Sequence, residues 1–491
     1  MKQKAIVIGG GFAGLSAAAY LAKDGYEVSL FEKNQQIGGR ARKLEIDGFT
    51  FDMGPSWYWM PDVFDNFFND FGSSVKEHYD LIRLDPSYAV FYGKDDVFRI
   101  PANLNEFYQL FEKHEPGSSK KLRQFLKDAE YKYEVSMTDF VHKPSLSILE
   151  FMDLRILNAA LKMDLFKSIS KYIKANFKNP KLVQLLEFPV LFLGAKPNET
   201  PALYSMMNYA DIVLGTWYPM GGMVKIVEAM VNIAKQQGVE IKTAENVEKI
   251  IVENGKATGI ISNDKTYKAD VIVGAADYHH IEQKLLAPEQ RNYSVDYWQS
   301  RKMAPSCLMY YIGIDKRIEG LEHHNLFFDA PFDIHAEEIY DRPQWPSNPL
   351  FYSTCAAKTD PSVAPAGKEN LVLLIPIAVD IEDSETIREK YYNIMMDRLE
   401  YLTGQSIKEH VIVKKSFAIN DFKKHYNSFG GNAYGLANTL KQTAILKPAL
   451  KNKKVKNLYY AGQLTVPGPG VPPSIISGKI VAKEIIKNRL R

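Results

Sequence analysis

The sequence has 491 residues, of which 46% are apolar and 24% are charged, and a formal net charge of +3. This composition is typical of a globular protein with two or three domains and a large core. The weak positive charge argues against a nucleic-acid partner, and the ten histidines and two cysteines show no spacing typical of a metal site.

The cysteines and the apolar runs bear on location. Two cysteines in a chain of this size do not make a disulfide scaffold, so we expect Cys307 and Cys355 to be reduced and the protein to be cytoplasmic. The first residues lead directly into a strand, which argues against a signal peptide. No run of about 18 or more apolar residues occurs, so we expect no membrane-spanning helix.

The first elements in chain order form a βαβ unit. Residues 4–8 are an apolar run typical of a buried strand, residues 15–23 form an Ala-rich helix, and residues 26–31 form a second strand. Glycines at positions 9, 11 and 14 give the spacing G-x-G-x-x-G between the first strand and the helix. In this context the spacing predicts a site for an adenine dinucleotide.

Each glycine of this turn has its own physical role. Gly9 permits the tight turn, Gly11 lets a pyrophosphate approach the backbone, and Gly14 lets the helix pack closely on the strand. The helix N-terminus offers free N–H groups to the phosphates. Glu32 ends the second strand, where an acid accepts a hydrogen bond from a ribose hydroxyl.

Two further turns follow the βαβ unit. Residues 38–42 place two glycines beside two arginines, which suits backbone contact with a cofactor and a guanidinium for phosphate or flavin; a solvated surface turn is the alternative. Residues 54–56 form a Gly-Pro-Ser turn, followed by Trp57 and Trp59. The two tryptophans are typical of core residues, although aromatic faces beside a cofactor also stabilise cationic substrates.

The middle of the chain mixes strands and helices. We expect strands at residues 308–314 and 371–377, a helix over 384–402, and two helices within 104–134 that are separated at Pro116 and Gly117. Near the C-terminus, residues 458–461 predict a buried strand, the Pro- and Gly-rich residues 467–473 a stiff loop, and residues 474–486 a helix.

Together these blocks resemble the FAD-dependent amine oxidase and phytoene desaturase superfamily. The C-terminal block, with Gly462, Gly470 and Pro472, is similar to the G-x-x-T-x-P-G-x-G-x-P signature of bacterial-type carotenoid desaturases, including hydroxycarotenoid 3,4-desaturases. The resemblance implies an α/β fold, in which a Rossmann-type FAD-binding domain of the glutathione reductase and amine oxidase kind carries a discontinuous α+β substrate domain. The sequence departs from the family at Lys447, where Arg often precedes the proline, and at Trp57.

The resemblance also implies which residues hold FAD. The Val247 backbone would contact the adenine, and the N-terminus of the last helix would face the flavin C2 carbonyl and N1, where reduction builds negative charge. The residues expected to bind FAD are Gly9, Gly11, Ala13, Gly14, Glu32, Gly39, Arg40, Gly54, Pro55, Ser56, Val247, Gly462, Gly470, Val471 and Pro472.

The order of the blocks predicts a chain that passes between two domains several times. We expect residues 1–75, 215–285 and 450–491 to form the FAD-binding domain. Residues 76–214 and 286–449 would form the substrate domain, which would also face the membrane.

The activity that the resemblance implies is the FAD-dependent desaturation of an acyclic carotenoid, phytoene-type or a 1-hydroxycarotenoid at C3–C4, by hydride transfer to flavin. No general base stands out by spacing; Glu150 and Asp153 are candidates only by their position in an apolar stretch. A single dinucleotide turn is visible, so quinone or oxygen is the expected electron acceptor. The same fold also allows a carotene isomerase, a polyprenyl reductase or a non-catalytic prenyl-binding escort-type protein.

Residues 145–193 interleave apolar side chains with lysines. Ile169, Ile173 and Phe177 recur at roughly helical spacing, which is typical either of a basic amphipathic helix on an anionic bilayer or of a helix packed on the core. Because a carotenoid dissolves only in the membrane, we favour the bilayer. We therefore expect a cytoplasmic protein that associates peripherally with the inner membrane.

Overall fold

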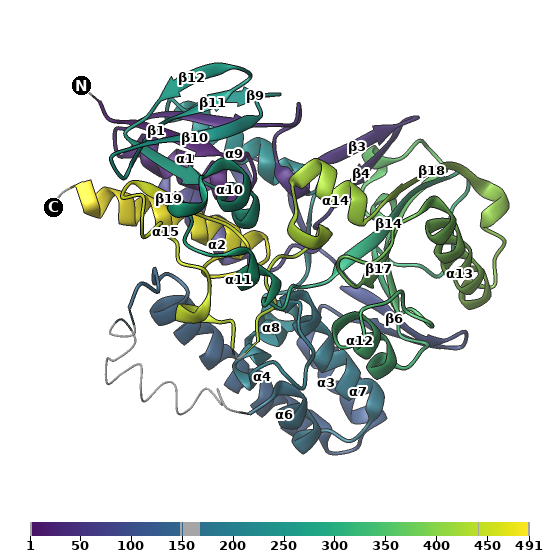
Figure 1. Cartoon of the computed structure of the whole chain (residues 1–491). Coiled ribbons are helices and arrows are strands. Elements are labelled where there is room, and N and C mark those ends of the chain that lie inside the picture. The colour runs from purple at the N-terminus through teal and green to yellow at the C-terminus, as the bar shows by residue number, and fades with distance from the viewer. Residues whose placement is uncertain (1, 148–149, 151–166, 440, 490–491) are drawn as a thin grey trace.

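The computed structural model describes residues 2–147, 150, 167–439 and 441–489. A parallel sheet contains strands from near both ends of the chain (Figure 1). Its strand order is β19-β13-β1-β2-β9, and every neighbouring pair is parallel. The bounds are β1 Lys4–Ile8, β2 Glu27–Glu32, β9 Glu240–Thr243, β13 Val271–Gly274 and β19 Leu458–Tyr460. The strand order reverses at β1, and in such sheets ligands bind at this point, beyond the carboxyl ends of the strands.

Both faces of this sheet are covered. Val7 of β1 packs with helices α1 (Phe12–Lys23) and α9 (Val224–Gln236), whereas Ile6 and Ile8 pack under a small antiparallel sheet and α10 (Tyr278–Leu285). The alternation follows from the strand period of two. The small sheet consists of β10 Val247–Glu253, β11 Lys256–Ser262 and β12 Lys265–Lys268.

The first and last long helices pack closely against each other. Helix α15 (Val471–Arg489) crosses α1 at Gly478, where a Cβ would lie 2.7 Å from the backbone nitrogen of Ala17. Ser16 Oγ donates to the carbonyl oxygen of Ile475 at 2.7 Å. This contact brings the N-terminus of α15, from the end of the chain, beside the glycine turn at its beginning.

A mixed sheet of seven strands forms the second layer, in the order β18-β14-β17-β16-β15-β6-β7, with only the β15–β6 pair parallel. All of β14 is buried, and helix α13 (Glu385–Thr403) packs on the sheet. The strands are β6 Tyr88–Gly93, β7 Asp96–Ile100, β14 Ser306–Ile314, β15 His324–Phe327, β16 Phe351–Thr354, β17 Glu369–Ile377 and β18 Val411–Phe417.

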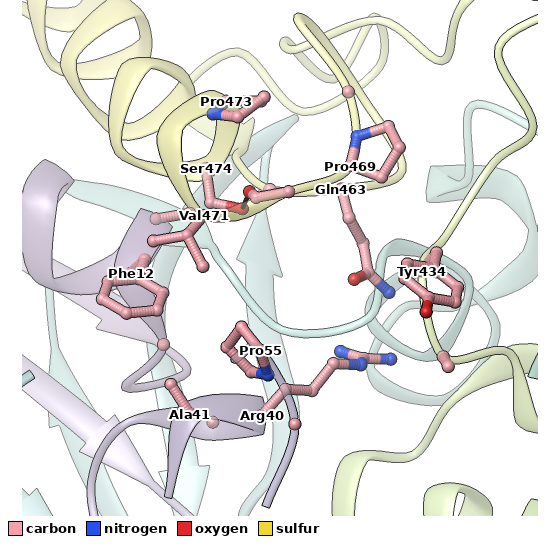
Figure 2. Close-up of a pocket in the computed structure, with 18 of the residues that line it drawn as sticks. Phe12, Arg40, Ala41, Pro55, Tyr434, Gln463, Pro469, Val471, Pro473 and Ser474 are labelled. Atoms are coloured by element: carbon pink, nitrogen blue, oxygen red, sulfur yellow. Dashed lines mark hydrogen bonds between the residues drawn. The ribbon is translucent and has the colours of Figure 1, made fainter. Parts of the chain in front are cut away.

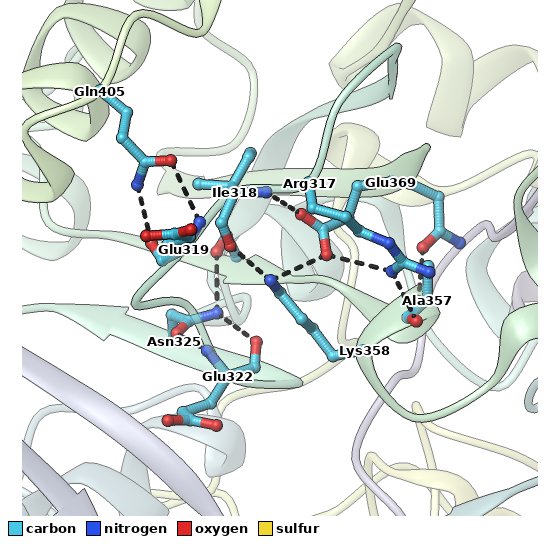
Figure 3. Close-up of polar contacts among 11 residues, drawn as sticks. Arg317, Ile318, Glu319, Glu322, Asn325, Ala357, Lys358, Glu369 and Gln405 are labelled. Carbon is cyan, nitrogen blue, oxygen red and sulfur yellow. Dashed lines mark hydrogen bonds and ion pairs between the residues drawn. The ribbon is translucent and has the colours of Figure 1, made fainter. Parts of the chain in front are cut away.

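A buried carboxylate ties the start of β17 to the neighbouring loops (Figure 3). The Glu369 side chain is fully buried; its Oε1 lies 2.9 Å from Lys358 Nζ and 3.4 Å from Arg317 Nη1. Its Oε2 accepts the backbone N–H of Ile318 at 2.6 Å. Because both oxygens are satisfied, the charge is compensated inside the protein.

Helices form a further layer at the bottom of Figure 1. They are α3 Leu104–His114, α4 Ser118–Val135, α6 Ile169–Asn176, α7 Pro180–Glu187 and α8 Met206–Asn208. In α6 both Ile169 and Ile173 are fully buried, and Phe177 follows in the same core. The preference for a bilayer-facing α6 was therefore wrong, because its apolar face is already used in packing. Among the described residues, no helix is long and apolar enough to span a bilayer.

The remaining elements connect these layers. Two short antiparallel pairs, β3–β4 and β5–β8, flank the sheets. Their bounds and those of the connecting helices are β3 Lys43–Ile46, β4 Phe49–Asp52, β5 Leu81–Arg83, β8 Trp217–Pro219, α2 Pro61–Asp70, α11 Val295–Gln299, α12 Phe332–Tyr340 and α14 Ile419–Tyr426.

Candidate functional site: a glycine-lined cavity with an apolar arm

A cavity of about 1030 Å³ runs from the carboxyl edge of the parallel sheet to the helical layer. This volume is at the upper end of the range of about 300–1,000 Å³ that is usual for small-molecule sites. One end is lined by the glycine turns, by residues after β2 and β13 and by residues at the start of β10, and we call it the nucleotide end. The other end is lined by apolar and aromatic side chains, and we call it the apolar arm.

The glycine turn after β1 has the geometry that its spacing predicted. Gly9 has a positive φ of 108°, and a Cβ there would lie 2.8 Å from the backbone nitrogen of Ala276. A Cβ on Gly14 would overlap the carbonyl oxygen of Gly9. A Cβ on Gly11 would meet nothing within 4 Å and would instead enter the cavity. Packing therefore requires glycine at positions 9 and 14, whereas Gly11 keeps a surface open for a ligand.

Glu32 is buried at the nucleotide end and is oriented by its neighbours. Its Oε2 accepts the backbone N–H of Gly10 at 2.9 Å, and its Oε1 accepts from both the backbone and the side-chain nitrogen of Asn34. The carboxylate thus faces the glycine turn, where it is in place to accept a hydrogen bond from a ribose.

The second and third turns pack onto the first. A Cβ on Gly39 would lie 3.2 Å from Gly11 Cα, and a Cβ on Gly54 would overlap the carbonyl oxygen of Arg40. The Arg40 guanidinium donates from Nη2 to Ser428 Oγ and to the Asn432 carbonyl, both at 3.2 Å. Its Nε is buried and has no hydrogen-bond partner among the residues that the structure describes. Burial lowers the pKa of Arg40 below its usual value.

The C-terminal segment closes the cavity from the opposite side. Figure 2 shows Val471, at the start of α15, beside Phe12 and above Pro55, and all three residues line the cavity. The backbone N–H of Gly462 donates to Ser477 Oγ, which in turn donates to the Val466 carbonyl at 2.7 Å. These bonds hold the proline-rich loop against the helix, so that the positive end of α15 faces the cavity.

These features fit an adenine dinucleotide that carries a flavin. The open cradle at Gly11 suits a pyrophosphate, and Arg40 Nε is an unpartnered donor beside the turn that follows it. Val247, at the start of β10, lies at the nucleotide end. The N-terminus of α15 suits the end of a flavin where negative charge develops.

The apolar arm begins at the tryptophans that follow the Gly-Pro-Ser turn. Trp59 is buried, and its Nε1 donates to Thr216 Oγ1 at 2.8 Å; Thr216 Oγ1 then donates to Asp211 at 3.1 Å. Trp57 stacks on His324 with ring centroids 4.1 Å apart. Further apolar lining comes from Met137, Phe140, Val141, Phe188, Leu191, Leu203, Met206, Met207, Leu326, Phe328, Phe332, Ile339 and Leu350.

Burial shifts the pKa of two groups in or beside this arm towards the neutral form. The pKa of Asp211, which also accepts from Tyr88, is raised to about 7 by desolvation. The pKa of His335 is lowered to about 4 by desolvation, and its Nδ1 accepts the backbone N–H of Leu350. Of the described residues that line the cavity, the carboxylates are Glu32, Glu245 and Asp277, and all three lie at the nucleotide end.

The structure places most of the candidate residues around this cavity. Gly14 lies just behind the lining, against Gly9. Glu150 does not line the cavity; its carboxylate accepts the backbone N–H groups of residues 145–147. Asp153 lies outside the described residues. The candidates that line the cavity are Gly9, Gly11, Ala13, Glu32, Gly39, Arg40, Gly54, Pro55, Ser56, Val247, Gly462, Gly470, Val471 and Pro472.

Sequence reasoning missed several lining residues. Tyr434 and Gln463 face the cavity beside Arg40 (Figure 2), and Asp277 caps α10 there. Burial raises the pKa of Asp277 to about 6. A signal existed for Asp277, which follows shortly after β13, the strand next to β1, and for Gln463, which follows Gly462. Tyr434 lies in an irregular loop and left no such signal.

Comparisons with known proteins agree with this geometry. The family described as flavin containing amine oxidoreductase matches residues 12–486. A carotenoid 3,4-desaturase of Haloarcula japonica is 41% identical, over 98% of this chain and 98% of the relative. A 4,4'-diapophytoene desaturase (4,4'-diaponeurosporene-forming) of Staphylococcus aureus is 32% identical, over 99% of both chains.

Solved structures share the fold at low identity. An oxidoreductase from Methanosarcina mazei superposes with a TM-score of 0.66 at 18% identity, covering 98% of this chain and 100% of the other. Cyclohexylamine oxidase from Brevibacterium oxydans superposes with a TM-score of 0.60 at 14% identity, covering 100% of both. At such identities the likeness concerns the fold alone.

Proposed function

Because the chain belongs to the family of flavin-containing amine oxidoreductases, we propose that it acts as an FAD-dependent desaturase that introduces double bonds into an acyclic carotenoid. The observation that carries this proposal is the continuity of the cavity, in which the glycine-lined nucleotide end opens into a long apolar arm. The desaturase relatives, at 41% and 32% identity over nearly the whole chain, support the same substrate class.

The chemistry divides between cofactor and protein. When bound, FAD supplies a two-electron acceptor for hydride removed from a carbon beside the polyene. The protein holds a straight hydrocarbon chain in the apolar arm and keeps water out. The aromatic faces of Trp57 and Trp59 would stabilise the positive charge that hydride loss leaves on the substrate. Loss of a proton from the neighbouring carbon to the solvent then completes the double bond.

The turn of residues 54–56 holds the reacting carbon of the substrate next to the cofactor. Gly54, Pro55 and Ser56 line the cavity just before the tryptophans of the apolar arm. Ser56 Oγ lies 2.8 Å from Tyr352 OH, which lies 2.7 Å from His324 Nδ1. This chain of hydrogen bonds fixes the turn, because each member is held by the next.

Product mass and absorption test the proposal. The FAD-loaded protein is incubated without oxygen with phytoene, lycopene or a hydroxylated carotene, plus a quinone. Each desaturation lowers the product mass by two hydrogens and shifts its absorption to longer wavelength, whereas isomerisation leaves the mass unchanged and reduction raises it. Unchanged mass with every carotene would refute the proposal.

A pair of variants on one helix links activity to the apolar arm. Ala336 of α12 lines the cavity, whereas Ile334 on the same helix is 46% exposed. We expect Ala336→Phe to retain FAD but to lose at least tenfold in activity, because the larger side chain fills the arm. Ile334→Phe should retain activity. Equal activity of the two variants would contradict a substrate in this arm.

We also propose that the protein works at a membrane surface and passes its electrons to a quinone or to oxygen. Two loops that line the cavity, at Ser145 and at Ala444, carry the exposed apolar side chains Leu146 (46%), Ile445 (40%) and Leu446 (50%). Such side chains beside a cavity for a lipid-soluble substrate suit insertion into a bilayer.

Vesicle sedimentation tests the membrane contact. Leu446→Asp should reduce binding to phosphatidylglycerol vesicles severalfold. Ile412→Asp, which changes an equally exposed apolar side chain (46%) on β18, should not. Equal binding of the two variants would refute contact through these loops. Flavin reoxidation by quinone and by oxygen, measured separately, tests the acceptor.

A further inference from the structure

Lys447 is a buried lysine directly behind the cavity wall near the start of α15. Only 5% of its surface is exposed. Its Nζ donates to Asn438 Oδ1 at 2.6 Å and to the carbonyl oxygen of Pro467 at 2.9 Å. Gly468 has a φ of 140°, and a Cβ there would overlap Lys447 Nζ. The amine therefore lies against the same loop whose front surface lines the cavity.

The surroundings of this amine are neutral. Within the described part of the chain, the two hydrogen-bond partners of Nζ, an amide oxygen and a backbone carbonyl, are uncharged. Desolvation alone lowers the pKa of Lys447 to about 7. A buried ammonium without a counter-ion costs stability, so such groups are found where charge has a use.

Asn438 connects the lysine to the cavity. Asn438 is 4% exposed and lines the cavity, while Lys447 holds its Oδ1. With the oxygen fixed, Asn438 Nδ2 has no hydrogen-bond partner within the described residues. Lys447 thus fixes both the orientation of a cavity-facing amide and the position of the Pro467 backbone.

We propose that Lys447 is a positioning residue of the cofactor site, which anchors Asn438 and the 467–470 loop and adds a positive charge where α15 begins. That charge adds to the helix dipole and favours the negative charge that two-electron reduction puts on the flavin. This inference rests on FAD binding in this cavity, as the proposed function does, but it is independent of the carotenoid.

The midpoint potential of the bound FAD, measured at about pH 6 and without any carotenoid, tests the inference, because an amine with a pKa of about 7 is mostly protonated there. Lys447→Met and Lys447→Gln remove the charge, and Gln keeps a polar group near Asn438. We expect both to lower the equilibrium constant for flavin reduction about tenfold, which is about 30 mV for a two-electron couple. Lys447→Arg should restore the potential, because it keeps the charge.

A second buried lysine provides the control. Lys132 is 1% exposed and contacts the Ala202 carbonyl in the helical layer, so Lys132→Met should leave the potential unchanged. Equal potentials in the neutral variants and the wild type would overturn the proposal. Loss of FAD from both neutral variants would also overturn it, since Lys447 would then have a structural role only. Failure of carotenoid turnover would leave this potential shift unaffected.

Discussion

Replacing Gly11 or Gly14 with alanine separates cofactor binding from packing in the same turn. Gly11 has a φ of −82°, which alanine adopts freely, and its Cβ would meet no protein atom within 4 Å. We therefore expect Gly11→Ala to change the free energy of unfolding of the FAD-free protein by less than about 1 kcal/mol. The new methyl group fills the space that a pyrophosphate needs, so FAD affinity should fall about 10- to 100-fold, or about 1.4–2.8 kcal/mol.

Gly14→Ala should instead lower the free energy of unfolding of the FAD-free protein. Its Cβ would overlap the Gly9 carbonyl oxygen, which is backbone and cannot move aside, and Ala275 Cβ lies 3.3 Å away. Overpacking of this kind costs about 1–3 kcal/mol. Urea unfolding of the FAD-free proteins and fluorescence titration with FAD measure the two quantities. Wild-type FAD affinity in Gly11→Ala, or equal destabilisation of both variants, would refute the claim that the open space at Gly11 binds the pyrophosphate.

Three more predictions concern stability. Burial raises the pKa of Asp211 from 3.8 to about 7, so the stability attributable to this carboxyl falls as pH rises between these values. Between urea unfolding at pH 5 and at pH 8, Asp211→Asn should therefore gain about 3 kcal/mol on the wild type. A pH-independent difference would contradict this. Glu369→Gln should lower the free energy of unfolding by about 3 kcal/mol, because it leaves Lys358 without its anion. Glu228→Gln on the surface should lower it by less than about 1 kcal/mol. Equal losses of stability in urea unfolding would refute the role of burial. Gly478→Val should separate α1 from α15 and weaken FAD retention on gel filtration, and full retention would contradict the close helix contact.

The local sequence was sufficient to predict those elements whose structure depends on residues close together in the chain. The βαβ unit and its glycine turn were predictable because strand period, helix propensity and glycine backbone freedom all act within a few residues. Helix α15 begins at Val471 rather than at the predicted Ser474, since prolines are accommodated in a first helical turn. The FAD-binding fold and the proposal of carotenoid chemistry followed from the order of the motifs and the family resemblance. The domain boundaries stay a prediction.

Only the tertiary structure decided what each side chain faces. Ile169 and Ile173 form an apolar stripe that suits a bilayer and a core equally well, and the neighbouring helices α4 and α7 decided for the core. Glu150 caps a local loop instead of reaching the cavity, and Lys447 meets the 467–470 loop from behind. Such placements depend on segments that are distant in the chain, and the desolvation that shifts the pKa of Lys447 exists only once those segments have packed together.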